Sequence, residues 1–186
     1  MEKDEVKSFI TQSLFLLMKS CNYEKITMLM IAKRAGVSRR TVYRYFENKN
    51  AILNEYFNDL INVYKRKLEY NIKENKNVIL LSFEFIFENS NFFKLAYKNN
   101  LLLNIYSAIE DIVKEIVSYN NEDLKNWNNE YLDFYVSFVA GGINKIFDRW
   151  LNEDVIKEPN EIFEIYKNVI CDLDKRISNV WKILSG

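Results

Sequence analysis

The chain has 186 residues, of which 48% are hydrophobic and 28% charged, a composition typical of folded globular proteins and not of disordered chains. Its 26 basic and 26 acidic residues cancel, so the net charge by itself indicates no partner. With only 4 Gly, 1 Pro and no Asn-Gly or Asp-Gly pair, the chain lacks the turn residues that a sheet protein of this size requires, and we predict an all-α fold.

The first predicted helix covers about residues 4–20, where apolar residues recur at spacings of three and four. A short helix over 28–34 follows Thr27, whose hydroxyl is a good N-terminal cap. Gly36 then supplies the left-handed backbone conformation that ends a helix within one residue. The chain is therefore expected to turn sharply at this point.

Ser38 is expected to cap a third helix over 39–45, which completes a helix-turn-helix inside a three-helix head. If Val42 and Phe46 face the small core of the head, the outer face carries Arg39, Arg40, Tyr43 and Arg44, with Thr41 and Tyr45 on its flanks. Such a helix suits the major groove of B-DNA, because Arg donates two hydrogen bonds to guanine and Tyr and Thr hydroxyls reach phosphates. A solvated basic helix is the alternative, but it would need neither the tyrosines nor the tight turn.

Charge is unevenly distributed along the chain. Residues 1–50 contain ten Lys or Arg and five Asp or Glu, a net charge of +5, which leaves −5 for the remainder. A basic head on an acidic body is expected if only the head meets a polyanion, although chance variation in solvated faces would give the same asymmetry.

The stretch from Ile26-Thr27 through Ile31-Ala32-Lys33-Arg34-Ala35-Gly36-Val37-Ser38 to Thr41-Val42-Tyr43-Arg44-Tyr45-Phe46 and Asn48-Lys49 resembles the signature of the TetR/AcrR family. The resemblance implies a homodimeric, all-helical regulator whose two heads bind a pseudo-palindromic operator in double-stranded DNA. It places Thr27, Tyr43, Tyr45 and Lys49 at phosphate-contacting positions, and Arg39, Arg40 and Thr41 at base-reading ones; Ser38 and Arg44 complete the predicted DNA-binding set. Many members have His where Tyr45 stands, but Tyr keeps a hydrogen-bonding tip.

A long helix over about 49–70 is predicted to connect the head to a helical body. This gives a DNA-binding domain over 1–48 and a ligand-binding and dimerisation domain over 49–186. Further helical patterns cover roughly 78–88, 91–98, 101–119, 126–151 and 159–184, and Pro159 suits the first turn of the last helix.

Gly141 and Gly142 lie within an apolar helical pattern, where two glycines should cost about 2 kcal/mol relative to alanine. Either the helix breaks there, or it packs closely against another helix, within the chain or across a dimer axis. With Trp150-Leu151 and Pro159, this run resembles the C-terminal domain of a TetR subgroup that includes regulators of dihydroxyacetone metabolism. In the family the last two long helices pair with their symmetry mates, which implies a dimer interface at Gly141, Gly142, Ile146, Trp150, Ile165, Val169 and Leu173.

A ligand pocket in the body is the family's usual switch, and aromatic residues are expected to line it: Phe83, Phe87, Phe92, Phe93, Tyr97, Tyr106, Tyr135 and Phe138. Plain core is the alternative for an aromatic stripe at this spacing. The predicted function is a sequence-specific DNA-binding repressor that a small apolar or aromatic effector releases. A transcriptional coactivator that acts through a protein partner is the alternative.

An enzyme is not expected. The chain has no His, which removes the commonest general base, and it shows no Gly-rich phosphate loop and no serine nucleophile motif. Its two cysteines are not spaced as metal ligands, so neither a cofactor nor a metal is predicted. We see no signal peptide and no apolar run near the roughly 20 residues of a membrane span, and predict a cytoplasmic location.

Overall fold

The computed structural model describes residues 3–74, 77–119, 128–153 and 157–170, and within these ranges the regular elements are helices. They are α1 (Lys3–Ser20), the 3₁₀ helix η1 (Tyr23–Lys25), α2 (Met28–Ala35), α3 (Arg39–Tyr45), α4 (Lys49–Lys73), α5 (Val78–Glu88), α6 (Ser90–Lys98), α7 (Leu103–Tyr119) and α8 (Asn129–Leu151). A further helix is described over residues 159–170. The predicted all-α fold is confirmed. None of the described helices combines the length and the apolar character that crossing a membrane would need.

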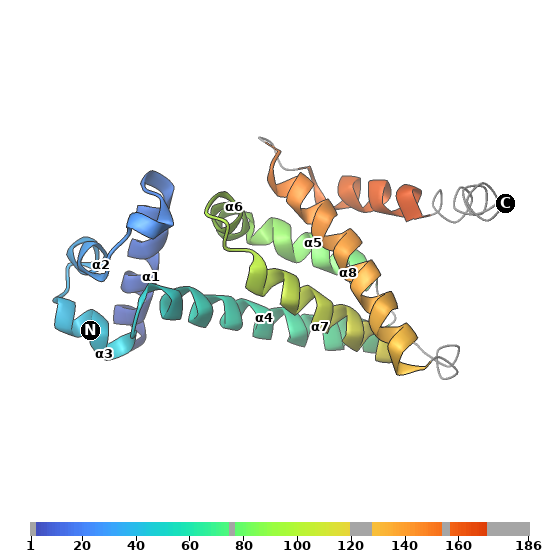
Figure 1. Cartoon of the computed structure of the whole chain (residues 1–186), viewed down its shortest axis with the longest axis horizontal. Coiled ribbons are helices and arrows are strands. Elements are labelled where there is room, and N and C mark those ends of the chain that lie inside the picture. The colour runs from blue at the N-terminus through green and yellow to red at the C-terminus, as the bar shows by residue number, and fades with distance from the viewer. Residues whose placement is uncertain (1–2, 75–76, 120–127, 154–156, 171–186) are drawn as a thin grey trace.

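The head of the molecule consists of α1, α2 and α3 around one apolar core (Figure 1). Ile10 and Leu14 of α1, Ile31 of α2 and Val42 of α3 are fully buried in it. Burying an aliphatic side chain of this kind contributes roughly 1.5–3 kcal/mol relative to leaving it exposed. The shared core therefore holds the three helices in place, and the short helices α2 and α3 are not long enough to be stable alone.

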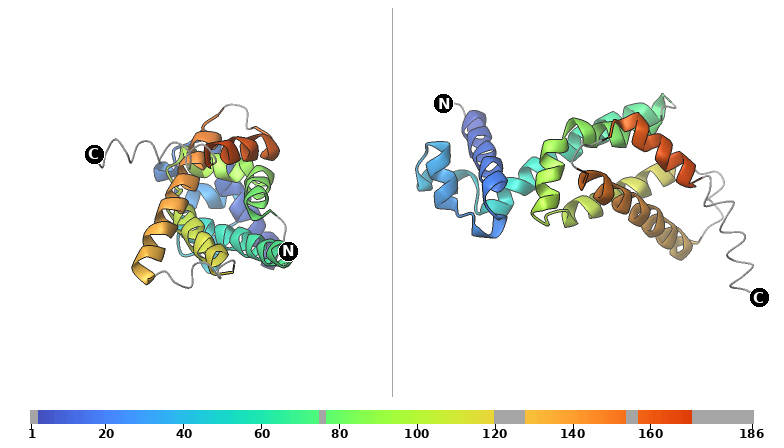
Figure 2. Two further views of the ribbon diagram at one scale, coloured as in Figure 1. Left: turned by 90° about the vertical axis from the view of Figure 1, so that its right-hand side faces the viewer. Right: turned by 90° about the horizontal axis from the view of Figure 1, so that it is seen from above.

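α4 belongs to both parts of the molecule. Ile52, near its start, is fully buried in the head core, whereas Phe57, Tyr64 and Leu68 are buried in the larger core of the body. Figure 1 and the right-hand view of Figure 2 show this helix leaving the head and continuing into the body, so that the head lies at one end of the molecule. One continuous helix is thus a mechanical link between the two cores.

Asparagine side chains fix the starts of three helices. Asn48, Asn77 and Asn128 precede α4, α5 and α8, and the side-chain oxygen of each accepts a backbone N–H of the first turn at 2.7–3.1 Å. Such a cap contributes about 1 kcal/mol. The cap at Asn128 sets the start of α8 at Asn129, three residues later than the predicted start at 126.

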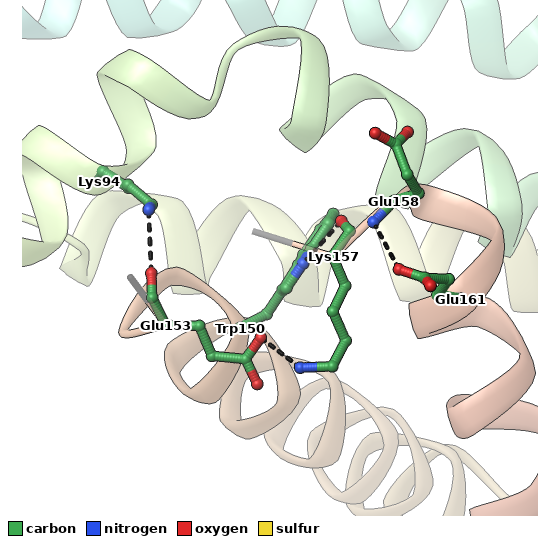
Figure 3. Close-up of polar contacts among 6 residues, drawn as sticks. All are labelled: Lys94, Trp150, Glu153, Lys157, Glu158 and Glu161. Atoms are coloured by element: carbon green, nitrogen blue, oxygen red, sulfur yellow. Dashed lines mark hydrogen bonds and ion pairs between the residues drawn. The ribbon is translucent and has the colours of Figure 1, made fainter. Parts of the chain in front are cut away.

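The end of α8 is tied to the neighbouring segments by polar contacts around Trp150 (Figure 3). Trp150 is 1% exposed, and its indole N–H donates to the backbone carbonyl of Lys157 at 3.2 Å. Lys94 of α6 donates to the carbonyl of Glu153 at 2.9 Å, and Lys157 pairs with the Glu153 carboxylate. The predicted role of Trp150 at a dimer interface is wrong, because an indole buried within its own subunit has no surface left for a partner.

The helix over 159–170 begins as predicted at Pro159. The carboxylate of Glu161 accepts the backbone N–H of Glu158 at 3.1 Å, which satisfies a free donor at the helix start (Figure 3). The remainder of the predicted helix, with the predicted interface residue Leu173, lies outside the described residues.

α8 runs through Gly141 and Gly142 without interruption, so the predicted alternative of a helix break is wrong. A Cβ atom built at either glycine would meet nothing within 4 Å in the described part of the chain. Close packing against that part of the chain is therefore not the reason for the two glycines.

Candidate nucleic-acid interface

Two side-chain caps and one glycine shape the helix-turn-helix. Thr27 Oγ1 accepts the backbone N–H of Met30 at 3.2 Å where α2 begins, and Ser38 Oγ accepts that of Thr41 at 3.0 Å where α3 begins. Between the helices Gly36 adopts φ 68° and ψ 24°, and its N–H bonds to carbonyls of the last turn of α2. This left-handed backbone strains any residue that carries a Cβ atom. The local structure predicted for the turn is confirmed.

α3 presents a basic and phenolic face to solvent. Val42 and Phe46 are buried at 0% and 3% exposure, as predicted, and they anchor the helix on the head core. The residues on the opposite face are exposed: Arg39, Arg40, Tyr43 and Arg44. Thr41 and Tyr45 are half-buried at its edges.

Two of the arginines stack on tyrosines of the same helix. The Arg39 guanidinium lies 5.3 Å from the ring centre of Tyr43 and donates to its hydroxyl at 3.4 Å. The Arg44 guanidinium lies 4.8 Å from the ring centre of Tyr45 and donates to its hydroxyl at 3.0 Å. Each phenol accepts these bonds, so its own proton remains for an outside acceptor such as a phosphate oxygen.

The arginine charges of α3 are not neutralised by the described part of the chain, where the ion pairs lie on other elements. Stacking on the phenols orients Arg39 and Arg44 without cancelling their charge. An exposed helix with three guanidinium groups that have no counter-ion in the described chain is the arrangement that attracts and reads a polyanion.

Lys49, predicted to contact a phosphate, is engaged within the chain in this structure. Its ammonium donates to the backbone carbonyls of Tyr23, Glu24 and Ile26 at 2.6, 3.2 and 3.2 Å, and it lies 4.3 Å from the ring centre of Tyr23. An ammonium has three N–H donors, so all of them are used within the chain. Lys49 therefore fastens the start of α4 to the connector between α1 and α2 in this structure, and its contact with a phosphate stays a prediction.

Tyr23, which the sequence pattern did not single out, is the centre of these contacts. It is 3% exposed, its hydroxyl donates to Asn50 Oδ1 at 2.5 Å, and its backbone N–H donates to Asn99 Oδ1 at 3.0 Å. Burial, with a smaller contribution from the charge of Glu24, raises the pKa of its hydroxyl to about 12. Through its side chain and its backbone N–H, this one residue joins η1, α4 and the end of α6.

An aromatic cluster lies at the same junction. Phe15 of α1, Tyr56 of α4 and Phe92 of α6 have ring centres 4.8–5.6 Å apart. Leu95 of α6 is buried in the head core, although it lies in the body segment of the chain. The head is therefore attached to the body through α6 as well as through α4.

The body contains an apolar cavity of about 230 Å³ between α4, α5, α6, α7, α8 and the helix over 159–170. Its wall is mostly aliphatic and aromatic, and its described lining includes no charged side chain. The lining residues are Phe57, Ile61, Tyr64, Ile79, Ser82, Phe85, Ile86, Phe93, Ile105, Ile109, Ile112, Val113, Ile116, Val117, Tyr135, Val139, Ile143, Phe147 and Tyr166.

Of the aromatic residues predicted to line a pocket, the structure brings Phe93 and Tyr135 to this cavity. Phe83 is instead buried in the core, Tyr106 donates to the Asp148 carboxylate, and Phe138 is 72% exposed on the outside of α8. Phe87 and Tyr97 do not line this cavity either, and Phe92 lines a separate pocket of about 240 Å³ between α4, α6 and the start of α7. Spacing along one helix does not show which neighbour a ring will meet, and β-branched residues that look like plain core form most of the wall.

Comparison with known proteins assigns the chain to a family. Residues 17–56 match the model of bacterial regulatory proteins of the tetR family, and residues 73–172 match a transcriptional regulator C-terminal region. The chain belongs to the TetR family. It is thus a transcription regulator with a DNA-binding helix-turn-helix, and the resemblance seen in the sequence is confirmed.

The individual proteins that the chain resembles are distant. The uncharacterized HTH-type transcriptional regulator YxbF of Bacillus subtilis (strain 168) is 21% identical over 169 residues, which cover 86% of this chain and 43% of that protein. The chain therefore spans less than half the length of this relative. The dihydroxyacetone kinase operon activator DhaS has the same fold, with a TM-score of 0.57, 18% identity, and 93% of this chain and 96% of that chain covered. So has the fatty acid degradation regulator FadR from Bacillus halodurans, with a TM-score of 0.60, 17% identity, and 90% and 95% covered.

Large apolar side chains are exposed on one face of α8 in this TetR-family chain: Tyr131 at 55%, Phe134 at 72% and Phe138 at 72%. Gly141 and Gly142 continue that face at helical spacing. On the helix over 159–170, Ile165 and Val169 are each 45% exposed. Ile146, predicted at the same interface, is half-buried against the body core, so much of its surface is already covered.

Proposed function

We propose that this TetR-family chain is a homodimeric repressor whose two heads bind a pseudo-palindromic operator, and that a small apolar effector releases it. The proposal divides the chain into a DNA-binding domain over 1–48 and a ligand-binding and dimerisation domain over 49–186. The observation that carries it is the outer face of α3, with its three arginines that the described chain leaves without a counter-ion.

In this proposal the side chains of α3 divide into two groups. Arg39, Arg40 and Thr41 lie at the start of the helix and read base edges in the major groove. Phosphates are contacted by hydroxyls and a guanidinium at the rim of that face: Thr27, Ser38, Tyr43, Arg44 and Tyr45. Thr27 supports this role because its oxygen accepts a backbone N–H, which leaves its own proton for a phosphate.

The exposed face of α8 supports the homodimer. Phe134 and Phe138 project from the surface beside two glycines with open space above them, and exposed apolar patches of this kind mark interaction sites. A partner helix could approach closely over Gly141 and Gly142, which would offset the roughly 2 kcal/mol that they cost relative to alanine. Ile165 and Val169 are proposed to extend the same interface.

The apolar cavity supports release by an effector. A bound molecule could favour a body conformation that holds the two heads at the wrong separation for half-sites one helical turn, about 34–36 Å, apart. Residues of α4 and α6, the two helices that also hold the head, form part of the cavity wall, so a change in its packing has a direct route to α3.

The proposal is tested by selecting DNA fragments that the full chain binds from a random pool. We expect a palindromic consensus whose half-site centres are one helical turn apart, and a dimer in sedimentation at the same protein concentration. A consensus without two-fold symmetry, or no enrichment at all, would contradict operator binding by a dimer. Deletion of the gene should raise expression of the operon beside the operator; a fall would contradict the repressor role and favour an activator.

A further inference from the structure

The size and wall of the body cavity limit what it can hold. An apolar cavity of about 150 Å³ holds benzene, with six carbon atoms, so by proportion this one has room for roughly nine non-hydrogen atoms. Its volume is about 230 Å³, and the described lining offers hydroxyl groups as its polar groups and no charged side chain. A charged ligand would leave water without a counter-charge, which costs several kcal/mol.

One polar pair on the wall, Tyr64 and Ser82, has a defined hydrogen-bond direction. Ser82 Oγ donates its one proton to the backbone carbonyl of Val78 at 2.9 Å. The contact of 2.6 Å between Tyr64 and Ser82 must therefore have the phenol as donor. Both protons are thus used within the chain, and the pair has only oxygen lone pairs left to offer.

Tyr64 carries its phenol proton at neutral pH, which a donor role requires. The residue is 3% exposed, and burial raises the pKa of its hydroxyl above the ordinary value of 10.0, an effect that the hydrogen bond with Ser82 opposes and the charge of Glu115 adds to. The phenol consequently keeps its proton at neutral pH, and the direction of the chain of hydrogen bonds rests on the bond from Ser82 to Val78.

We propose that the cavity binds a neutral, largely apolar molecule that carries a single hydrogen-bond donor, such as a medium-chain alcohol or an alkylphenol, with the donor directed at the lone pairs of Tyr64 and Ser82. A carboxylate of the same length is rejected, because the described wall gives it no cation. The inference deepens the proposed function and rests on it for the consequence for DNA binding.

Calorimetry of the full chain without DNA tests the ligand class with three probes of similar size: octanol, which has a donor, heptyl methyl ether, which has only an acceptor, and octanoate, which is charged. A net hydrogen bond corresponds to a several-fold change in affinity, so we expect octanol to bind about fivefold more tightly than the ether. Octanoate should bind at least about a hundredfold more weakly than octanol.

A pair of serine variants tests the hydrogen-bond direction. In Ser82→Ala the Tyr64 proton is no longer engaged, so the preference for octanol over the ether should disappear or reverse. Ser107→Ala, which changes an exposed serine of α7 outside the cavity, should keep the preference. Val139→Phe fills part of the cavity and should abolish saturable binding of octanol; helical circular dichroism checks that each variant is folded.

Several results would overturn the inference. Equal affinity for octanol and the ether in the natural chain would contradict the need for a donor, and octanoate binding as tightly as octanol would contradict the need for neutrality. Octanol binding that Val139→Phe leaves unchanged would place the ligand elsewhere. If octanol binds as expected but leaves operator affinity unchanged, the ligand class stands and the effector role under the proposed function fails. If octanol binds as expected but the DNA selection fails, the ligand class stands and operator binding under the proposed function fails.

Discussion

Replacing Lys49 distinguishes an anchor within the chain from a contact with DNA. The 2.6 Å bond from its ammonium to the carbonyl of Tyr23, a buried residue, is the strongest of its three bonds, and the ammonium also faces the Tyr23 ring. A hydrogen bond from a charged group contributes about 1.5–3 kcal/mol, while the two longer bonds at 3.2 Å add less because Lys49 is itself half-exposed. We therefore expect Lys49→Ala to lower the free energy of unfolding by about 2–3 kcal/mol.

Two measurements on the same variant give the answer. Urea unfolding followed by circular dichroism gives the loss of stability, and fluorescence anisotropy with labelled operator at several salt concentrations gives the salt slope of binding. Lys49→Met keeps the aliphatic stem over the Tyr23 ring and should lose less stability than the alanine variant. Lys25→Ala removes an exposed lysine from the same connector and should change stability by less than about 0.5 kcal/mol.

The anchor assignment predicts an unchanged salt slope for Lys49→Ala at a temperature where the variant is folded. The opposite pair of results would refute it: unchanged stability together with a slope that falls by about 0.9, the value for one lost phosphate contact. That outcome would mean that the ammonium leaves the three carbonyls when DNA is bound.

Three further predictions concern the α3 face, the α8 face and pH. Arg40→Ala should weaken operator binding by about 1–3 kcal/mol, and anisotropy with scrambled DNA should show a much smaller loss. Phe138→Glu should shift the dimer to monomer in sedimentation equilibrium, whereas Leu103→Glu, a change at a 78% exposed apolar residue of α7, should not. Burial raises the pKa of Tyr23 from 10.0 to about 12, so as the pH rises its hydroxyl is deprotonated in the unfolded chain before it is deprotonated in the folded chain. The contribution of Tyr23 to the free energy of unfolding, at most about 2–3 kcal/mol, is present below pH 10 and should be lost between about pH 10 and 12. In Tyr23→Phe the free energy of unfolding, measured with urea, should fall less over that range.

The head could be predicted almost completely from the sequence because its determinants are local. The caps at Thr27 and Ser38 and the left-handed Gly36 act over three or four residues, and the burial of Val42 and Phe46 follows from helical period alone. Such short-range rules leave few alternatives for how the chain can fold.

The body and the joint could not be predicted in the same way, because their contacts link distant positions. The amide of Asn99 meets the backbone of Tyr23 across 76 residues, and no spacing rule connects them. Phe138 and Phe93 look alike in the sequence, yet the first is exposed on α8 and the second lines the cavity. An apolar pattern identifies which residues avoid water, but it does not state whether core, cavity or partner covers them.

The same two helices that line the cavity also hold the head, and this determines how a ligand could act at a distance. On α4, Tyr64 lines the cavity while Lys49 is fastened to the connector. On α6, Phe93 lines the cavity, and Asn99, directly after this helix, accepts from Tyr23. A shift of α4 relative to α6 must therefore be absorbed near Tyr23, because both helices are bonded to that one residue and its neighbours. Since the interior is close-packed, such a joint moves as a unit and does not stretch gradually, so expanding the cavity by one ligand would be expected to rotate the head as a whole.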